Sequence, residues 1–344
     1  MDFSSILIGR EACLRDAMRK LDDLNCKILF VADNNVLIGS LTDGDIRRFL
    51  LDGGKIEDSA EMAANHNVHT ASNAAEAARL LKQADYVAIP IVNSKNEILD
   101  IYRDKHIKKK CNPINIPVVI NAGGKGTRLD PFTRVLPKPL IPVGELPIIE
   151  HIMRGFIDYG CNEFHTIVNY KKQLIKSFFS ESERQYDISF YDEKEPLGTG
   201  GGLSLLKGKL HETFFFTNCD ILLRSNFESI YRFHKEHNNM ITMVCAYKNF
   251  VVPYGVVSMG ENGQILEMRE KPEMSFLTNT GVYIVEPEVL EDIEDNVSIG
   301  FPDIIEKQKA KGKNVAVYPI SENEWLDMGQ LPELEQMRKK LYGE

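Results

Sequence analysis

An apolar run leads directly into a glycine-rich loop about a third of the way along the chain. Residues 118–129 read Val-Val-Ile-Asn-Ala-Gly-Gly-Lys-Gly-Thr-Arg-Leu. The apolar residues predict a buried strand, and the glycines let the backbone turn sharply and approach an anion closely. Successive N–H groups at such a turn, followed by a helix N-terminus, supply positive potential. The segment therefore predicts a strand end that binds phosphate groups.

Two widespread phosphate-binding loops do not fit this segment. A Walker A loop requires a glycine and a Ser or Thr where Val119 and Gly126 stand. The dinucleotide fingerprint G-x-G-x-x-G requires a glycine where Leu129 stands. Neither a P-loop ATPase nor a nicotinamide dehydrogenase is supported.

Short apolar runs alternate with helical patterns over the rest of the chain. Strands interleaved with helices predict an α/β fold with a mostly parallel sheet covered on both faces. Ligands of such sheets bind beyond the carboxyl ends of the strands. The predicted strands are residues 118–120, 164–168, 214–217, 241–246, 254–259 and 281–285.

The N-terminal third contains an internal repeat. Residues 28–46 read as strand, polar turn, strand and helix start, and residues 87–107 repeat that order. A helical pattern precedes each copy, so we expect two half-domains that pack on one another. Two prolines lie within residues 111–117, which places the domain boundary there. We predict domains at 1–112 and 118–344, with a linker at 113–117.

The repeat resembles a tandem pair of CBS domains. Gly39, Thr42 and Asp45 match that family's pattern at a strand-to-helix junction. The resemblance implies that Thr42 faces a phosphate and Asp45 the ribose hydroxyls of an adenine nucleotide, as a regulatory ligand. The second copy departs from the pattern, with Arg103 and His106 at these positions. The alternative is a pair that only folds, dimerises or spaces the chain.

The glycine loop is followed by Leu-Pro-Lys-Pro-Leu-Ile-Pro-Val-Gly at residues 136–144. Together they resemble the A-G-G-x-G-[ST]-R-L and P-K-P signature of nucleotidylyltransferases that act on sugar phosphates. The resemblance implies a Rossmann-like, mostly parallel sheet, with Arg128 on the outgoing pyrophosphate and Lys138 on the reacting phosphates. Cations suit this role, because in-line phosphoryl transfer is catalysed mainly by charge neutralisation. The implied triphosphate-binding residues are Ala122, Gly123, Gly124, Gly126 and Thr127.

Two acidic residues match the metal ligands of that family. Asp220 follows the predicted strand at 214–217, and Asp327 lies within Trp-Leu-Asp-Met-Gly at 325–329. Two carboxylates together with phosphate oxygens suit Mg²⁺. Taken alone, Asp220 is also typical of a helix cap or turn.

Further segments resemble the substrate-binding parts of the family, in the same order along the chain. The implied sugar-phosphate residues are Gly255, Glu270, Lys271, Asn279 and Thr280. On the base side the resemblance implies Glu195 and Gly198, for which a surface turn is the alternative. A histidine pair, His234 and His237, has no third metal ligand nearby and is interpreted as a solvated helix face.

Composition excludes several partners. A formal net charge of -9 argues against a basic face for nucleic acid. The six cysteines are scattered without a C-x-x-C pair, which favours reduced thiols. Neither a signal peptide nor a membrane span is predicted, so we expect a cytoplasmic protein without membrane contacts. We also expect a homo-oligomer.

A CBS pair ahead of this transferase resembles enzymes of bacterial legionaminic acid synthesis. The resemblance implies GTP and glucosamine 1-phosphate as substrates. A carboxylate at Glu195 facing the base would accept from the N1–H and 2-amino group of guanine. The alternative substrates for the same reaction are UTP or dTTP with another hexose 1-phosphate or a heptose 1-phosphate. A silent nucleotide-sensing protein and a scaffold that only binds sugar nucleotide are the alternatives from other classes.

Overall fold

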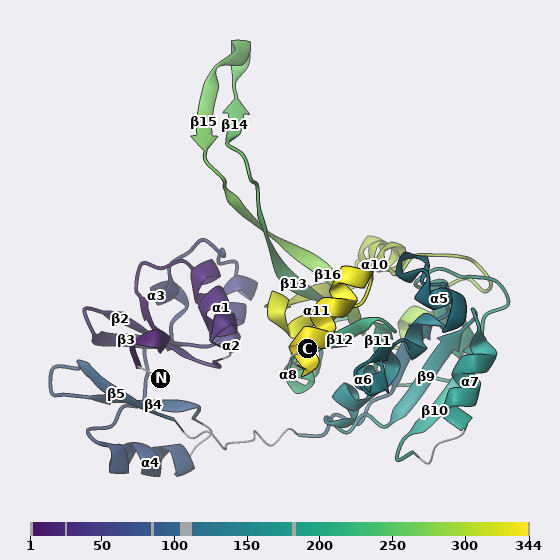
Figure 1. Ribbon diagram of the computed structural model, residues 1–344, viewed down its shortest axis with the longest axis horizontal. Coiled ribbons are helices and arrows are strands. Elements are labelled where there is room, and N and C mark those ends of the chain that lie inside the picture. Colours follow the sequence, from purple (N-terminus) through teal and green to yellow (C-terminus); the bar gives the residue numbers. More distant parts are fainter. Residues whose placement is uncertain (1–2, 25, 84–85, 104–111, 181–183, 343–344) are drawn as a thin grey trace. The chain divides into compact units, whose positions relative to one another are not determined.

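The computed structural model describes residues 3–24, 26–83, 86–103, 112–180 and 184–342 (Figure 1). The chain forms two compact units. The first comprises Met1–Lys110 and Asn249–Ser275, and the second comprises Cys111–Lys248 and Phe276–Glu344. No helix within these described ranges is both long and apolar enough to cross a bilayer.

The first unit confirms the predicted order of elements in the first copy, and the helix and strand pair of the second copy. The helix start that was expected after the second strand pair falls at residues 104–107, outside the described residues. The first copy contains α1, β2 and β3, with β1 parallel to β2 and β3 antiparallel to it, and α2 follows. The second copy contains α4 and the antiparallel pair β4 and β5. The bounds are η1 (Phe3–Ile6), β1 (Leu7–Gly9), α1 (Leu14–Asp23), β2 (Leu29–Asp33), β3 (Val36–Leu41), α2 (Asp43–Leu51), α3 (Ala60–Ala63), α4 (Ala74–Gln83), β4 (Ala88–Val92) and β5 (Ile98–Arg103).

The two copies contact each other through their turns, as expected. The backbone N–H of Leu37 donates to the Asn96 carbonyl at 2.9 Å, and that of Ile98 donates to the Asn35 carbonyl at 2.8 Å. Asn35 and Asn96 have φ of 67° and 63°, a region that asparagine tolerates better than most residues. The asparagines at equivalent places in the two turns therefore shape the surface on which the copies meet.

A seven-stranded sheet forms the centre of the second unit, in the order β10-β9-β6-β11-β16-β13-β17. The four strands from β10 to β11 are mutually parallel, and β16 runs antiparallel to β11. The mostly parallel sheet is therefore confirmed, with β10 and β17 added to the predicted strands. The bounds are β6 (Val118–Ala122), β9 (Glu163–Val168), β10 (Asp187–Asp192), β11 (Phe214–Asn218), β13 (Ile241–Val251), β16 (Glu273–Val285) and β17 (Val315–Ser321).

Both faces of this sheet are covered. Val118 and Ile120 of β6 pack in one apolar cluster with residues of α6, whereas Val119 packs in another that includes Phe301. Alternate side chains of a strand point to opposite faces, so both faces are buried. Among the described residues of the second unit, the helices of eight or more residues are α6 (Ile148–Ile157), α7 (Lys172–Ser180), α8 (Phe227–Glu236), α10 (Phe301–Ala310) and α11 (Leu331–Tyr342), and shorter ones include α5 (Phe132–Val135), α9 (Glu288–Glu291) and η4 (Gly201–Leu206).

Two predictions differ from the structure in detail. The strand expected at 254–259 is β14 (Val256–Met259), which pairs with β15 (Ile265–Arg269) in a separate two-stranded sheet. The expected linker at 113–117 packs on the second unit, because Ile116 is buried in its core and the N–H of Ile114 donates to the Tyr159 carbonyl at 2.7 Å. Other small sheets pair β7 (Pro142–Val143) with β8 (Leu146–Pro147), and β12 (Ile221–Leu223) with β18 (Trp325–Asp327).

Candidate active site

The carboxyl ends of the four parallel strands lie at one edge of the sheet. Gly123 follows β6, Asn169 follows β9, Glu193 follows β10, and Asp220 closely follows β11. The Gly123 carbonyl accepts from the backbone N–H of Tyr170 at 3.3 Å, and the Asn169 amide donates to the Glu193 carbonyl at 3.3 Å. This edge is where ligands of parallel sheets bind.

The glycine loop packs against the lysine of the Pro-Lys-Pro segment. Gly126 has φ of 65°, and a Cβ there would lie 2.9 Å from the Thr133 side chain and 3.1 Å from Cβ of Lys138. Only glycine tolerates both the conformation and the approach. Thr127 and Arg128, in η2 (Thr127–Leu129), are exposed, so this part of the loop is open to a ligand. The fold thus brings the two halves of the sequence signature together.

Asp220 and Asp327 lie next to each other through the pairing of β12 with β18. Ile221 is the register partner of Asp327, and the N–H of Met328 donates to the Asp220 carbonyl at 2.9 Å. Burial and the charge of Asp220 raise the pKa of Asp327, while Lys138 and Arg128 act in the opposite direction. The ammonium of Lys138 forms an ion pair with the Asp220 carboxylate. Four of the predicted phosphate and metal residues therefore share one electrostatic environment.

This carboxylate pair fits a divalent cation. Oδ1 of Asp327 is buried and has no hydrogen-bond partner among the described residues. A buried oxygen without a partner costs free energy, which a cation would recover. Mg²⁺ takes one or two protein carboxylates and completes its shell with water and phosphate oxygens. Asp220 and Asp327 therefore have the chemistry of a Mg²⁺ site that shares its ligands with a nucleotide.

Glu193, just after the end of β10, lies at the same sheet edge and was not singled out in the sequence analysis. Its side chain is buried, with 4% of the residue exposed. A Cβ on Gly123 would lie 2.6 Å from its Oε2, and one on Gly202 would lie 2.7 Å from its Oε1. Burial raises the pKa of this carboxyl to about 7, although a hydrogen bond from the Leu197 backbone acts to lower it. A carboxyl group that changes charge near neutral pH therefore lies between the two glycine-rich segments.

Packing within the second unit requires a glycine in the loop at residues 195–202. Glu195 is exposed, whereas Gly198 has φ of 77° and a Cβ there would lie 2.6 Å from the Ile299 carbonyl oxygen. The same carbonyl accepts from the N–H of Gly200 at 3.0 Å. The glycine at 198 is thus required by packing within the second unit, whatever ligand the loop meets.

The predicted sugar-phosphate residues are divided between the two compact units. Asn279 and Thr280 belong to β16 in the second unit, where Thr280 is buried and its hydroxyl donates to the Val244 carbonyl at 2.8 Å. Gly255, Glu270 and Lys271 lie in the segment that belongs to the first unit. The compact unit that holds Lys138, Asp220 and Asp327 therefore does not include them.

Thr42 and Asp45 of the first unit bond to each other in the structure. They form a capping box at the start of α2, with the Thr42 hydroxyl donating to Asp45 Oδ2 at 2.6 Å and the Asp45 N–H donating to the hydroxyl at 3.2 Å. Asp45 also pairs with Arg48. Helix capping alone is therefore enough to explain why Thr42 and Asp45 occupy these positions. His106 of the second copy lies outside the described residues.

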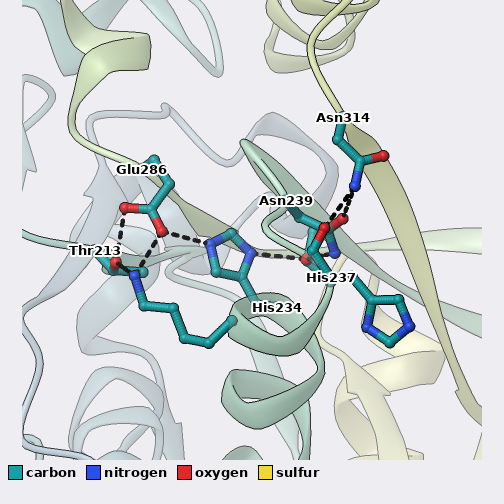
Figure 2. A network of polar contacts seen from close by, with 8 residues as sticks. Thr213, His234, His237, Asn239, Glu286 and Asn314 are labelled. Carbon is teal, nitrogen blue, oxygen red and sulfur yellow. Dashed lines mark hydrogen bonds and ion pairs between the residues drawn. The ribbon is translucent and has the colours of Figure 1, made fainter.

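The interpretation of the histidine pair is wrong for His234 and confirmed for His237. His234 is fully buried, and its ring contacts the Thr242 hydroxyl at 2.8 Å. The other ring nitrogen contacts Glu286 Oε1 at 3.1 Å (Figure 2). The position follows Phe227 and Ile230 on the buried face of α8, with helical spacing. His237 is exposed. Within the described part of the chain no group of three or more metal-ligating side chains occurs, so neither histidine belongs to such a cluster.

Comparison with known proteins places this geometry in a family. The family model described as "Nucleotidyl transferase" matches residues 117–343. The catalytic subunit beta of mannose-1-phosphate guanylyltransferase from Drosophila pseudoobscura pseudoobscura is 35% identical over 223 residues, which cover 62% of this chain and 58% of that protein. The mannose-1-phosphate guanyltransferase of Schizosaccharomyces pombe is 34% identical over 226 residues, which cover 62% and 60%. The match thus spans less than two thirds of the length of either relative.

Solved structures share the fold. HddC from Yersinia pseudotuberculosis superposes with a TM-score of 0.52 at 21% identity, covering 65% of this chain and 99% of that one. A UDP-glucose pyrophosphorylase complexed with UDP-glucose gives a TM-score of 0.52 at 19% identity, covering 66% and 98%. Since the family model matches more than half of the residues, the chain belongs to the nucleotidyl transferase family.

Proposed function

We propose that this protein joins a nucleoside triphosphate to a sugar 1-phosphate and releases pyrophosphate. The observation that carries the proposal is the convergence of Lys138 with Asp220 and Asp327 beside the glycine loop. A binding scaffold would have no need for a buried lysine paired with a carboxylate at the edge where ligands of parallel sheets bind. The same convergence argues against a silent sensor, because the charged groups needed for phosphoryl transfer are all present.

Each residue has a role in direct transfer. The N–H groups of the glycine loop and the guanidinium of Arg128 bind the β- and γ-phosphates. Lys138 neutralises charge on the α-phosphate while a phosphate oxygen of the sugar attacks the α-phosphorus. The bond from that phosphorus to the bridging oxygen breaks, and pyrophosphate leaves opposite the attacking oxygen. Asp220 and Asp327 would hold Mg²⁺, which supplies further neutralisation of phosphate charge.

We propose GTP as the nucleotide and glucosamine 1-phosphate as the acceptor. The names of the curated relatives favour guanine. Glu195 is exposed on a loop beside Glu193, so its carboxylate is available to accept from the N1–H and 2-amino group of guanine. Mannose 1-phosphate is the acceptor that the relatives' names favour, and UTP or dTTP with another hexose or heptose 1-phosphate is the remaining alternative. A matrix of triphosphates and sugar 1-phosphates, scored by pyrophosphate release, tests every pair.

We also propose that residues 1–112 form a CBS pair that binds a regulatory nucleotide through Thr42 and Asp45. The two-copy repeat and the contact between its turns support the pair. The capping box at α2 supports the alternative that these residues only stabilise the fold. Calorimetry of the full chain with AMP, compared with Thr42→Ala, separates the two: a ligand role requires binding that the variant loses.

A further inference from the structure

Helix α11, in the second unit, packs on the segment that follows Lys138. Leu334 and Met337 of this helix are buried in the same apolar cluster as Ile141 and Val143. Lys138 begins the short helix directly before Ile141. Since side chains in a core are close-packed, a displacement of α11 would be transmitted to the backbone that carries the lysine.

The same helix holds β7 and the turn after it. The Arg338 guanidinium donates to the Pro142 carbonyl at 3.0 Å. Gly144 has φ of 62°, and a Cβ there would lie 2.2 Å from Cζ of Tyr342. Only glycine accommodates both this left-handed conformation and the aromatic ring. Arg338 and Tyr342 lie on one side of the helix, at the spacing of one turn, so both act on the same loop.

Helix α6 contacts this turn as well. Nε2 of His151 donates to the Val143 carbonyl at 2.8 Å, because a carbonyl oxygen can only accept. The Tyr342 hydroxyl lies 3.4 Å from that same nitrogen, and the two rings meet edge to face. The proton on Nε2 is already directed to Val143. The ring of Tyr342, rather than its hydroxyl, therefore makes the principal contact with the turn.

Helix α11 also packs on the strand that carries Asp327. It contacts β18, and Leu326 and Met328 on either side of Asp327 are buried in the apolar cluster that contains Leu334. One helix thus packs on both the segment of Lys138 and the segment of the second carboxylate. Neither segment can shift without a change in the packing of α11.

We propose that Tyr342 and Arg338 are positioning residues, which fix the turn after β7 and so hold the Lys138 ammonium in place beside Asp220 and the reacting phosphate. This inference rests on the proposed function. A cation lowers the barrier of phosphoryl transfer only when it is already placed where charge develops. The lysine side chain is a flexible stem, so its place depends on the backbone that carries it. Tyr342 and Arg338 act through that backbone.

Variants of the two residues provide the first test. Tyr342→Ala is expected to lower kcat roughly tenfold, because a partial misplacement of a catalytic group is enough for such a loss. Tyr342→Phe keeps the ring and is expected to turn over as wild type. Arg338→Met, a second variant at the same loop, is expected to lower kcat as Tyr342→Ala does. Lys339→Ala, at an exposed position of the same helix, is the control. Wild-type kcat in both Tyr342→Ala and Arg338→Met would overturn the proposal.

A double-mutant cycle with Lys138→Met separates positioning from a general structural role. If Tyr342 acts through Lys138, its ring has nothing left to position once the ammonium is gone. Tyr342→Ala is therefore expected to lower kcat by less than about twofold in the Lys138→Met background. The full loss in both backgrounds would show that Tyr342 does not act through Lys138.

Urea unfolding of the same four proteins gives a readout that does not depend on turnover. If the turn holds Lys138 against Asp220, the shift in urea midpoint caused by Lys138→Met should be smaller in Tyr342→Ala than in wild type. Equal shifts in the two backgrounds would overturn the proposal. A wild-type protein without turnover on any substrate pair would instead defeat the proposed function, and the unfolding cycle would still decide whether Tyr342 holds Lys138.

Discussion

The ammonium of Lys138 and the carboxylate of Asp220 form an ion pair whose two side chains are about nine-tenths buried. They are 82 residues apart in sequence and link the Pro-Lys-Pro segment to the end of β11. Removal of one partner from a buried pair leaves the other charge uncompensated, at a cost of about 3–5 kcal/mol. The pair therefore contributes to the fold and also sets the charge of the phosphate site.

Lys138→Met is expected to lose both turnover and stability. The variant keeps the apolar stem but removes the cation that faces Asp220 and the reacting phosphates. We expect a loss of roughly a hundredfold or more in kcat/KM, the scale of one lost electrostatic group. The control is Lys339→Met at an exposed position. Pyrophosphate release and urea unfolding measure the two effects, and Lys138→Met kinetics equal to those of the control would remove Lys138 from the mechanism.

Asp220→Asn is expected to abolish turnover, because it removes charge from the proposed metal site with little change in shape. It also leaves the buried Lys138 ammonium without its counter-charge, so a loss of stability is expected as well, with the folded state still populated at the assay temperature. The charge of Asp220 also raises the pKa of Asp327, so that pKa is expected to fall in the variant. Circular dichroism checks the fold. Calorimetric titration with Mg²⁺ in the presence of a non-hydrolysable GTP analogue measures the metal site. Wild-type affinity for Mg²⁺ in the variant would contradict the assignment.

The pH dependence of stability is expected to report on Glu193. Its pKa of about 7 lies above the ordinary value of about 4.3, so the folded state holds a proton that the unfolded state releases between these values. The contribution of Glu193 to stability is therefore greatest below about pH 4 and falls as pH rises through this window, by on the order of 3 kcal/mol. Glu193→Gln is expected to abolish that fall, so its melting temperature should exceed that of wild type at pH 8 and match it near pH 4. Parallel melting curves for the two proteins across this range would refute the prediction.

The contribution of Glu286 to stability is expected to be lost at acidic pH, opposite to that of Glu193. Although burial acts to raise its pKa, hydrogen bonds from His234, Lys235 and Thr213 lower the pKa to about 2. Its contribution to stability is present above about pH 4.5 and is lost as pH falls toward 2, by up to about 3 kcal/mol. Acid titration of Glu286→Gln should show a shallower loss of stability than wild type. Glu288→Gln, at an exposed position, is the control and should behave as wild type.

The sheet edge at which Gly123 and Asp220 lie could be predicted from sequence, because the signals for the strands are local. The strand before Gly123 and the strand before Asp220 have their own apolar patterns, and the ends of parallel strands meet at one edge. Glu193 could not be predicted, because its burial depends on close contacts with Gly123, far earlier in the chain, and with Gly202, across the loop that follows it. The burial of His234 had a signal in the sequence, its helical spacing after Phe227 and Ile230, but its partners could be seen only in the folded chain.

The pairing of β14 with β15 could not be predicted from sequence either. An apolar run at 254–259 predicts a strand, but no local signal tells whether that strand joins the main sheet or pairs elsewhere. Its partner β15 and the register between them decide this. The grouping of Gly255, Glu270 and Lys271 with the first unit could only be seen in the folded chain.

The most direct test of the central claim is pyrophosphate release by the wild-type chain with Mg²⁺, across GTP, UTP, dTTP, CTP and ATP and a set of sugar 1-phosphates. The account predicts turnover that is fastest with GTP and glucosamine 1-phosphate and that disappears in Asp220→Asn. A faster rate with another base or sugar would replace the substrate assignment and leave the reaction in place. Absence of turnover with every pair, from a folded protein that binds nucleotide, would contradict the account.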